Sequence, residues 1–459
     1  MIETKKVKKP VRTISGVTPL TVVLKPKKCN HGTCIYCPGG DNVPQSYTDK
    51  SPAIMRALAL EFDPYRQVMN RLEVLEKMGH PTDKIELIII GGTFLQYDIN
   101  YQYKFVKDCY DALNGKKAKD LNQAKKWNEI SKHRCVAMCI ENRPDSCSES
   151  EINRMLEFGT TRIEIGVQIL DDEIYQKVNR GHTVKDVIES TERLKNAGFK
   201  LGYHVMPGIP YSNPEKDIEM FKKIFDDNKF RPDQIKIYPC QIVEGSLLSR
   251  IYKEINFKSY TQEQARKIVT EMMKIIPEYC RVMRIMREIP KEKITNAIEK
   301  LDLRKDIERE FRDSGVKIKE IRMREIGFNK KEGVSDIKLK ILEYEASNGK
   351  EFFLQFVDLD NVLYGLLRLR IFKDKETGQD KAIIRELHVY GQAFEIGKKG
   401  EEKNFTQHSG LGKILLEKAE EITKEQGIKN LLIISGVGVR QYYERLGYEL
   451  DGPYMNKHF

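Results

Sequence analysis

The sequence predicts an α/β protein in which a partial barrel of six parallel βα units is followed by a smaller mixed α/β domain. From residue 20 to about residue 240, short apolar strands alternate with amphipathic helices, a pattern typical of a parallel sheet covered by helices. From Asp336 onward, strand-like segments follow one another directly, as in an antiparallel meander. Six units are too few to close an eight-stranded barrel. We therefore expect an open barrel and a second, separate sheet.

The strand predictions are based on short runs of apolar and β-branched residues. In the first region the expected strands are 21–24, 85–90, 135–140, 162–168, 200–206 and 234–238. In the second region they are 336–344, 351–357, 362–372, 382–390 and 431–435. Between the first strands, apolar residues at spacings of three and four predict helices with one buried face, as in Val68, Leu72 and Leu75.

The composition predicts a soluble globular chain with room for two or three cores, because 32% of its 459 residues are charged and 40% are hydrophobic. No apolar run approaches the roughly 20 residues of a membrane span, and the N-terminus lacks the apolar core of a signal peptide. We expect a cytoplasmic protein without membrane association. In that compartment the nine cysteines indicate metal ligands and reduced thiols rather than disulfides. We expect six to be structural: Cys109, Cys135, Cys139, Cys147, Cys240 and Cys280.

The formal net charge of +11 is concentrated partly at the start of the chain. Residues 1–28 contain eight lysines and arginines against the single carboxylate of Glu3. This distribution suits a phosphate-rich partner such as RNA, and a solvated basic tail would account for it equally well.

Three cysteines in the stretch CNHGTCIYCPGG are the strongest chemical signal in the chain. Cys29, Cys34 and Cys37 follow the first predicted strand and can converge on one metal centre. A closed zinc site needs four protein ligands, and no second CxxC or HxxxH follows. Three ligands favour a 4Fe-4S cluster with one open iron. The alternatives are three unrelated buried cysteines or a zinc knuckle that lacks a ligand.

Polar and glycine residues gather at the expected carboxyl ends of the strands, where catalytic groups lie in such folds. Gly91, Gly92 and Thr93 follow the second strand, where a backbone without side chains can approach a ligand. Glu164 in the fourth strand needs a polar partner if it faces the interior, either a ligand or an internal ion pair. Lys236 in the sixth strand is either a functional cation or a residue that faces outward.

The second region contains a glycine loop that opens a helix at Gln407, His408, Ser409, Gly410, Leu411 and Gly412. A glycine loop at a helix N-terminus presents unpaired amides and the positive end of the helix dipole, which suits a pyrophosphate group. A strand precedes this loop, and another strand and the pair Tyr442–Tyr443 follow it. Tyr443 is then either a functional group beside the ligand or a core aromatic residue.

These motifs resemble two known families. The spacing C-x4-C-x2-C with Tyr36 resembles the radical S-adenosylmethionine (SAM) enzymes, although the commonest first gap in that family is three residues. The pattern Q-x-x-G-x-G resembles the GNAT acetyltransferases, whose loop holds coenzyme A. The resemblance implies a partial (βα)6 radical SAM barrel followed by a GNAT-type mixed α/β domain. It implies a 4Fe-4S cluster, SAM and acetyl-CoA as cofactors.

The combination is more specific, because CxYCPGG, GGTF, RxEIGVQ, NRGHT, SGVGxRxYY and GPYM together resemble the catalytic subunits of Elongator, in an archaeal-type version. That family implies placing a carboxymethyl group on carbon 5 of the wobble uridine of tRNA, with the carbon taken from acetyl-CoA by radical chemistry. It implies binding of the anticodon stem-loop, and a homodimer or Elongator-like accessory subunits as protein partners. Such a mechanism requires the two cofactor sites to face each other. At 322–325 the chain reads RMRE, so we expect no zinc there.

The resemblance also implies a role for individual residues. Cys29, Cys34 and Cys37 would bind the cluster, and Gly91, Gly92, Thr93, Glu164, Gln168 and Met206 would bind SAM. Acetyl-CoA would contact Lys84, Glu386, Leu387, His388, Val389, Gln407, His408, Ser409, Gly410, Leu411, Gly412, Lys413, Tyr442 and Tyr443. Lys236 and Tyr443 would be catalytic.

The expected organisation is a basic N-terminal segment (1–19), a radical SAM domain (20–275), a helical connector (276–335) and a GNAT acetyltransferase-like domain (336–459). Two other functions compete with tRNA modification. One is a protein lysine acetyltransferase in which the radical SAM domain is only a scaffold. The other is an RNA-binding platform without catalysis.

Overall fold

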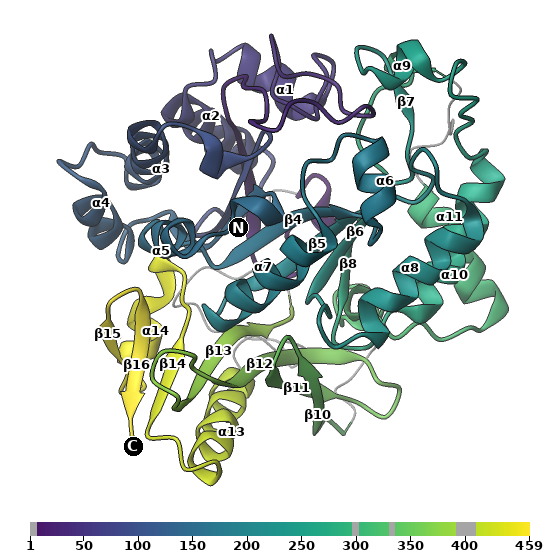
Figure 1. Cartoon of the computed structure of the whole chain (residues 1–459). Helices are drawn as coiled ribbons and strands as arrows, with labels where there is room; N and C mark the ends of the chain where they lie inside the picture. Colours follow the sequence, from purple (N-terminus) through teal and green to yellow (C-terminus); the bar gives the residue numbers. More distant parts are fainter. Residues whose placement is uncertain (1–6, 296–302, 330–335, 392–409) are drawn as a thin grey trace.

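The computed structural model describes residues 7–295, 303–329, 336–391 and 410–459, and these residues form two large sheets with helices packed against them (Figure 1). The upper and lower halves of Figure 1 correspond to the two regions predicted from the sequence. The predicted α/β class is confirmed, with a parallel sheet first and a mixed sheet second.

The first sheet has seven strands, all parallel, in the order β1-β2-β3-β4-β5-β6-β8. Its strands are β1 (Thr18–Val23), β2 (Lys84–Ile90), β3 (Arg134–Asn142), β4 (Arg162–Gln168), β5 (Lys200–Val205), β6 (Gln234–Ile237) and β8 (Arg281–Ile285). The first six coincide closely with the predicted strands, and all six pair with their neighbours in chain order. Strand order therefore follows directly from the repeated βα units.

The seventh strand comes from a stretch where the sequence predicts only a helical connector. β8 pairs with β6 along the outer edge of the sheet, and its mixed burial weakened the strand signal in the sequence. The arginines in RVMRI alternate with buried Val282 and Ile285. As a result, the barrel sheet continues past residue 275 and the second sheet begins only at Lys338.

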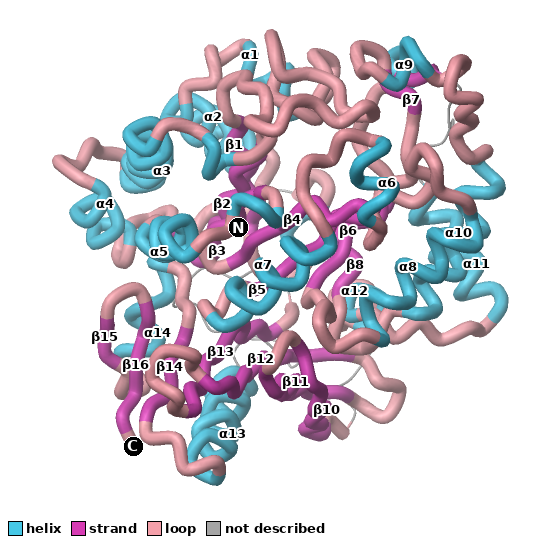
Figure 2. Tube along the Cα trace, in the orientation of Figure 1, coloured by secondary structure: helices cyan, strands magenta, loops and turns pink. Residues whose placement is uncertain are grey.

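Helices cover the outside of the first sheet, as Figure 2 shows in cyan. The helices of this part of the chain are α1 (Pro52–Leu58), α2 (Pro64–Lys77), α3 (Ile99–Asn114), α4 (Leu121–Asn128), α5 (Glu149–Glu157), α6 (Asp172–Lys177), α7 (Val184–Asn196), α8 (Pro214–Asp226), α9 (Leu248–Ile251), which lies beside β7, α10 (Gln262–Ile275), α11 (Leu303–Ser314) and α12 (Ile321–Arg324). Several begin where a side chain satisfies the first free amides, for example the capping box of Thr183 and Asp186 in α7.

The second sheet also has seven strands, in the order β10-β11-β12-β13-β14-β16-β15. They are β10 (Lys338–Ala346), β11 (Gly349–Val357), β12 (Leu363–Lys373), β13 (Asp380–Val389), β14 (Asn430–Ile433), β15 (Glu449–Asp451) and β16 (Tyr454–His458). β10 to β13 form the predicted meander. β13 and β14 are parallel but pair over only three residues, Ala382–Ile384, so within the described chain β13 extends beyond its partner. Helix α13 (Leu411–Glu425) packs on β12 and β13.

The second sheet packs against the amino ends of the first sheet's strands. Arg385 in β13 donates two hydrogen bonds to Asp233, directly before β6, at 2.6 and 2.7 Å. The backbone approaches equally closely at η5 (Val437–Val439), where a Cβ on Gly436 would lie 2.0 Å from the carbonyl oxygen of Val136 in β3. Only glycine permits this approach. The contact is therefore a dense interface rather than a flexible linkage.

Short elements complete the described chain. They are η1 (Pro10–Thr13), η2 (Phe94–Gln96), η3 (Pro144–Ser146), η4 (Lys291–Lys293), the paired strands β7 (Ile242–Val243) and β9 (Ile294–Thr295), and α14 (Arg440–Glu444). Among the described helices, none combines the length and the apolar character that crossing a bilayer requires.

Candidate active site at the mouth of the barrel

The three cysteines lie together in a tight loop directly after β1. The amide of Gly32 donates to the carbonyl of Cys29 at 3.1 Å, and the amide of Cys37 donates to the carbonyl of Cys34 at 2.9 Å. These turns fold the loop back on itself. Cys29 Sγ lies 3.7 Å from Thr93 Oγ1, so the glycine turn after β2 borders the cysteine loop as predicted from the carboxyl ends of parallel strands.

Basic side chains surround Cys34. Its sulfur accepts from Arg180 Nη1 at 3.6 Å and lies 3.4 Å from His31 Nε2. Burial alone would raise the pKa of Cys34, but the charge of Arg180 and the hydrogen bond from His31 lower it to about 6. Cys34 is consequently a thiolate near neutral pH, which is the form that binds metal.

The pKa values of the other two thiols depend on burial and on neighbouring charges. Burial raises the pKa of Cys37 to about 11, and the negative charges of Cys34 and Cys29 add to the increase. Burial also raises the pKa of Cys29. The three sulfurs therefore influence one another electrostatically.

Buried polar atoms without partners test whether a cofactor fits here. Around the cysteine loop, five residues in the described chain have such atoms: His31 Nδ1, the Tyr36 hydroxyl, Gln45 Oε1, Arg180 Nε and both ring nitrogens of His182. Unpaired buried polar groups are destabilising and rare in folded proteins. A polar, anionic ligand set would satisfy them, so these residues fit a 4Fe-4S cluster with SAM.

The backbone around this pocket is shaped for close approach. Gly91 and Gly92 have positive φ values of 127° and 98°, and Gln168 at the end of β4 has a φ of 71° although it is not glycine. Such conformations are strained for a side chain and occur at ligand sites. Gln168 Oε1 is buried without a partner, and its carbonyl accepts from the amide of Met206 at 2.8 Å. The SAM residues predicted at these strand ends thus lie at one mouth.

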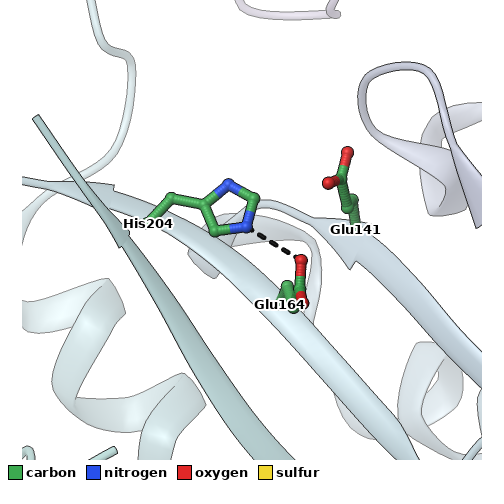
Figure 3. A group of neighbouring side chains, drawn as sticks. All are labelled: Glu141, Glu164 and His204. Atoms are coloured by element: carbon green, nitrogen blue, oxygen red, sulfur yellow. Dashed lines mark hydrogen bonds and ion pairs between the residues drawn. The ribbon is translucent and has the colours of Figure 1, made fainter. Parts of the chain in front are cut away.

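A second cluster lies on neighbouring strands of the barrel sheet, and Figure 3 shows three of its side chains. Glu141, Glu164 and His204 project from neighbouring strands, and their ligand atoms lie within 4.8 Å of one another. Lys236 Nζ forms ion pairs with both Glu141 and Glu164. Burial opposes ionisation of Glu164, but Lys236 and Arg162 hold its pKa well below the usual range. Lys236 therefore faces inward, and Glu164 takes part in the internal ion pair that was the alternative interpretation.

The glycine loop of the second sheet begins α13. Gly410 is the N-cap with a φ of 82°, and Leu411, Gly412 and Lys413 form the first turn. A Cβ on Gly412 would lie 3.3 Å from the Tyr442 hydroxyl and 3.6 Å from Val389 Cγ2, so three predicted acetyl-CoA residues meet here. Gln407, His408 and Ser409 lie outside the described residues.

The other residues predicted to contact acetyl-CoA lie in different environments. Glu386 is held by Lys200 at 2.7 Å and Arg368 at 2.8 Å, and His388 Nε2 lies 2.7 Å from the carbonyl of Ser15. Leu387 is half-buried, and Tyr443 is buried in the second core cluster beside the less buried Tyr442. Tyr442 rather than Tyr443 borders the glycine loop. Lys84, at the start of β2, is half-buried, which lowers its pKa.

The second sheet contacts the barrel at the amino ends of its strands, opposite the end that carries the cysteine loop. The cysteines lie at the carboxyl ends of the barrel strands, whereas β13 contacts the amino ends through Arg385 and Asp233. β4 has seven residues, which corresponds to roughly 20 Å. The polar interior of the barrel lies between the sites: Arg162 begins β4, pairs with Glu86 at 3.1 Å, and lies in register beside Lys200, which binds Glu386.

Several residues of the site were not assigned a role from the sequence. Arg180, His31 and Arg143 form the basic wall around Cys34, and Arg143 Nη1 lies 3.2 Å from His31 Nε2. Arg180 belongs to the motif NRGHT, but nothing in that motif indicates contact with a cysteine 146 residues away. Gly166 marks the same contact, because a Cβ there would lie 2.6 Å from Arg180 Nη2.

Comparison with known proteins agrees with this geometry. Residues 24–224 match the Radical SAM superfamily, and residues 232–312 match a Radical SAM C-terminal domain. The chain is 47% identical to the tRNA uridine(34) acetyltransferase of Dehalococcoides mccartyi, covering 98% of this chain and 99% of that protein. The chain belongs to this family. It is also 38% identical to human Elongator complex protein 3, covering 98% of this chain and 85% of the relative.

A solved structure of the same family confirms the architecture. The archaeal Methanocaldococcus infernus Elp3 with an N-terminal deletion superposes with a TM-score of 0.85 at 41% identity, covering 97% of this chain and 100% of that one. Membership in the family confirms the predicted kinship with Elongator catalytic subunits and the radical SAM class. It also implies a 4Fe-4S cluster and SAM at the cysteine loop.

Proposed function

We propose that this chain places a carboxymethyl group on carbon 5 of the wobble uridine of tRNA, with SAM radical chemistry and acetyl-CoA. The observation that carries the proposal is that one chain combines a thiolate-stabilising cysteine pocket with a glycine-capped helix beside Tyr442. Relatives over the full length are named tRNA uridine(34) acetyltransferase, which supports the same substrate here.

Cys29, Cys34 and Cys37 would hold the cluster, and Gln168 and the turn at Gly91–Gly92 would help to hold SAM. When bound, the cluster and SAM supply the one-electron chemistry that breaks an unactivated C–H bond. The side chains of this chain have simpler tasks. Arg180 keeps Cys34 ionised, and the buried layer of Tyr36 and His182 keeps bulk water away from the reacting atoms.

Acetyl-CoA would be held in the second half. The free amides at the start of α13 suit its pyrophosphate, and β13 beyond Ile384 offers extended backbone next to Gly412. Tyr442 lies at the point where these two elements meet, so it is the hydroxyl best placed to contact a thioester.

A basic and aromatic surface beside the cysteine loop suits RNA. Lys25 Nζ lies 4.5 Å from the centre of the half-buried Tyr101 ring, and Lys27 Nζ lies 5.8 Å from that of Tyr97, which is buried beneath it. Lys28 is exposed next to them. Cations and aromatic rings side by side bind the phosphates and bases of single-stranded loops such as an anticodon. The proposal includes accessory subunits or a homodimer because membership in the family implies such partners.

Anaerobic incubation with tRNA, SAM, a reductant and acetyl-CoA, followed by mass spectrometry of the nucleosides, tests the proposal. We expect carboxymethyluridine from the parent chain and none from Cys34→Ala. Cys109→Ala is the matched control, because Cys109 is a buried core thiol away from the loop. Product that persists at the parent level in Cys34→Ala would refute the radical role. Acetyl-lysine that survives loss of all three cysteines but not of Gly412 would favour a lysine acetyltransferase instead.

A further inference from the structure

The interior cluster of Tyr47, Glu141, His204 and Lys236 carries a function beyond internal ion pairing. Resting on the proposed function above, we infer that this cluster is the pocket that recognises the uracil ring by its Watson–Crick edge and rejects cytosine. The inference starts from the order of donors and acceptors around one carboxylate.

Glu141 is flanked by a donor on each side. Lys236 Nζ donates to Glu141 Oε1 at 3.2 Å, and the Tyr47 hydroxyl donates to Glu141 Oε2 at 3.0 Å. A ligand therefore meets a donor, an acceptor and a donor in sequence. An ammonium has three protons and a hydroxyl can rotate, so both donors can turn toward a ligand without leaving the site.

This order matches uracil and mismatches cytosine. Uracil presents O4, N3–H and O2, which is an acceptor, a donor and an acceptor. Cytosine presents an amino donor followed by two acceptors, so its N3 lone pair would meet the Glu141 carboxylate and its amino group would meet the Lys236 ammonium. Enzymes that act on an extruded base read it by hydrogen bonds to this edge.

The charges of the cluster favour a neutral ligand. Arg162 and Lys236 are paired with Glu86, Glu141 and Glu164. Arg284 of the neighbouring β8 pairs with Glu288 at 3.2 Å and also lies within electrostatic reach of Glu141. Each of these cations thus has a carboxylate partner, and each carboxylate has a cation. A free anion or a divalent cation would disturb this balance, whereas a nucleobase would not.

A metal ion is the chemical alternative for the three residues in Figure 3. The ammonium of Lys236 argues against it, because this group contacts Glu141 and Glu164 and supplies the positive charge that an ion would bring. Bound metal would have to displace a buried, fully paired lysine.

The layering of the site shows where the ligand enters. The side chains of Lys236, Glu141 and His204 are 14%, 15% and 15% exposed, whereas that of Glu164 beneath them is 1% exposed. Glu164 Oε1 accepts no hydrogen bond and has only an ion-pair contact with Arg162 at 3.6 Å. The ring of Tyr238 stands edge-on to His204 at 5.5 Å and adds an aromatic wall.

The pocket adjoins the cysteine loop through one short segment. Gln45 Nε2 donates to the carbonyl of Pro38, the residue after Cys37, at 3.0 Å, and Tyr47, two residues after Gln45, donates to Glu141. Carbon 5 lies on the side of the ring away from N3 and O2. A uracil that places N3–H on Glu141 therefore points carbon 5 away from the carboxylate that holds it.

Equilibrium binding of anticodon stem-loops tests the inference without needing turnover. The loops carry uridine, cytidine or 3-methyluridine at position 34, and binding is followed by fluorescence anisotropy of the parent chain, Glu141→Ala and Glu86→Ala. The parent should bind the uridine loop about tenfold more tightly than the other two. Glu141→Ala should lose most of that preference, because the acceptor is gone and a methyl group fits the vacated space.

Glu86→Ala is the matched control, since it removes a carboxylate that pairs with Arg162, whereas Glu141 is the carboxylate that pairs with Lys236 and accepts from Tyr47. It should keep the parent ratio between uridine and 3-methyluridine even if overall binding weakens. A preference that is absent in the parent, or unchanged in folded Glu141→Ala, would overturn the inference. So would a stoichiometric divalent metal that disappears with Glu141. Selective binding without carboxymethyl product would instead contradict the proposed function alone.

Discussion

Removing the carboxylate of Asp233 should destabilise the whole chain, because this residue joins the two halves. Asp233 is fully buried and accepts both terminal nitrogens of Arg385, and it also accepts the amide of Leu201 at 2.8 Å. Lys195 and Arg368 lie 3.6 Å away as further cations. In Asp233→Ala, positive charges would stay buried without their main counter-charge.

The expected loss follows from that geometry. Breaking a buried ion pair by removing one partner costs about 3–5 kcal/mol, because the remaining charge stays out of water. This corresponds to roughly two to four powers of ten in the unfolding equilibrium constant. A surface pair gives the matched control: Glu73 binds Lys77 on the exposed side of α2, and Glu73→Ala should change stability by less than about 1 kcal/mol.

Urea unfolding followed by two probes would measure the effect. Trp127, the single tryptophan, lies in α4 beside the first core, whereas circular dichroism reports both sheets. In the parent we expect the two transitions to coincide, and in Asp233→Ala the second sheet should unfold at lower urea than the tryptophan signal. A change below about 1 kcal/mol with coincident transitions would refute the reasoning that this buried contact joins the halves.

Three further outcomes follow from the geometry. Gly166→Ala should push Arg180 away from Cys34, since the new Cβ would lie 2.6 Å from Arg180 Nη2. The rate of SAM cleavage should then fall roughly tenfold to a hundredfold while the stability of the protein stays near that of the parent. An unchanged rate of SAM cleavage would contradict this reasoning. Gly412→Val should abolish acetyl-CoA turnover, because the new side chain would crowd Tyr442 and Val389. SAM cleavage measured without tRNA should persist. Equal loss of both activities would argue against separate sites. Burial opposes ionisation of Glu351, but the charges of Arg385 and Lys195 lower its pKa to about 2. This pKa lies below the unfolded value of about 4.3. The stabilisation that ionised Glu351 contributes is therefore complete above about pH 4.3 and is lost as the pH falls toward 2. Acid unfolding by circular dichroism should therefore begin in that window and be less steep in Glu351→Gln; a steepness equal to the parent's would contradict the assignment.

Much of the fold was predictable because its signals are local. The run RIEIGVQ matches β4 at both ends, since apolar residues at every second position and a preceding turn define a strand within seven residues. The cysteine loop was equally visible, because Cys29, Cys34 and Cys37 lie close in sequence and their chemistry depends on residue type and spacing. β8 was missed because its arginines at an edge of the sheet weaken the apolar pattern.

The sequence by itself therefore determined the first six strands of the barrel sheet, their parallel direction and the chemistry of the cysteine loop. Tertiary structure alone decided which distant groups meet: Tyr47 and Glu141 are 94 residues apart, Cys34 and Arg180 are 146 apart, and Asp233 and Arg385 are 152 apart. It also decided that Lys236 faces inward and that the second sheet docks on the amino ends of the barrel. The physical reason is that strand periodicity arises from neighbours along the chain, whereas ion pairing and docking depend on how buried surfaces fit in three dimensions.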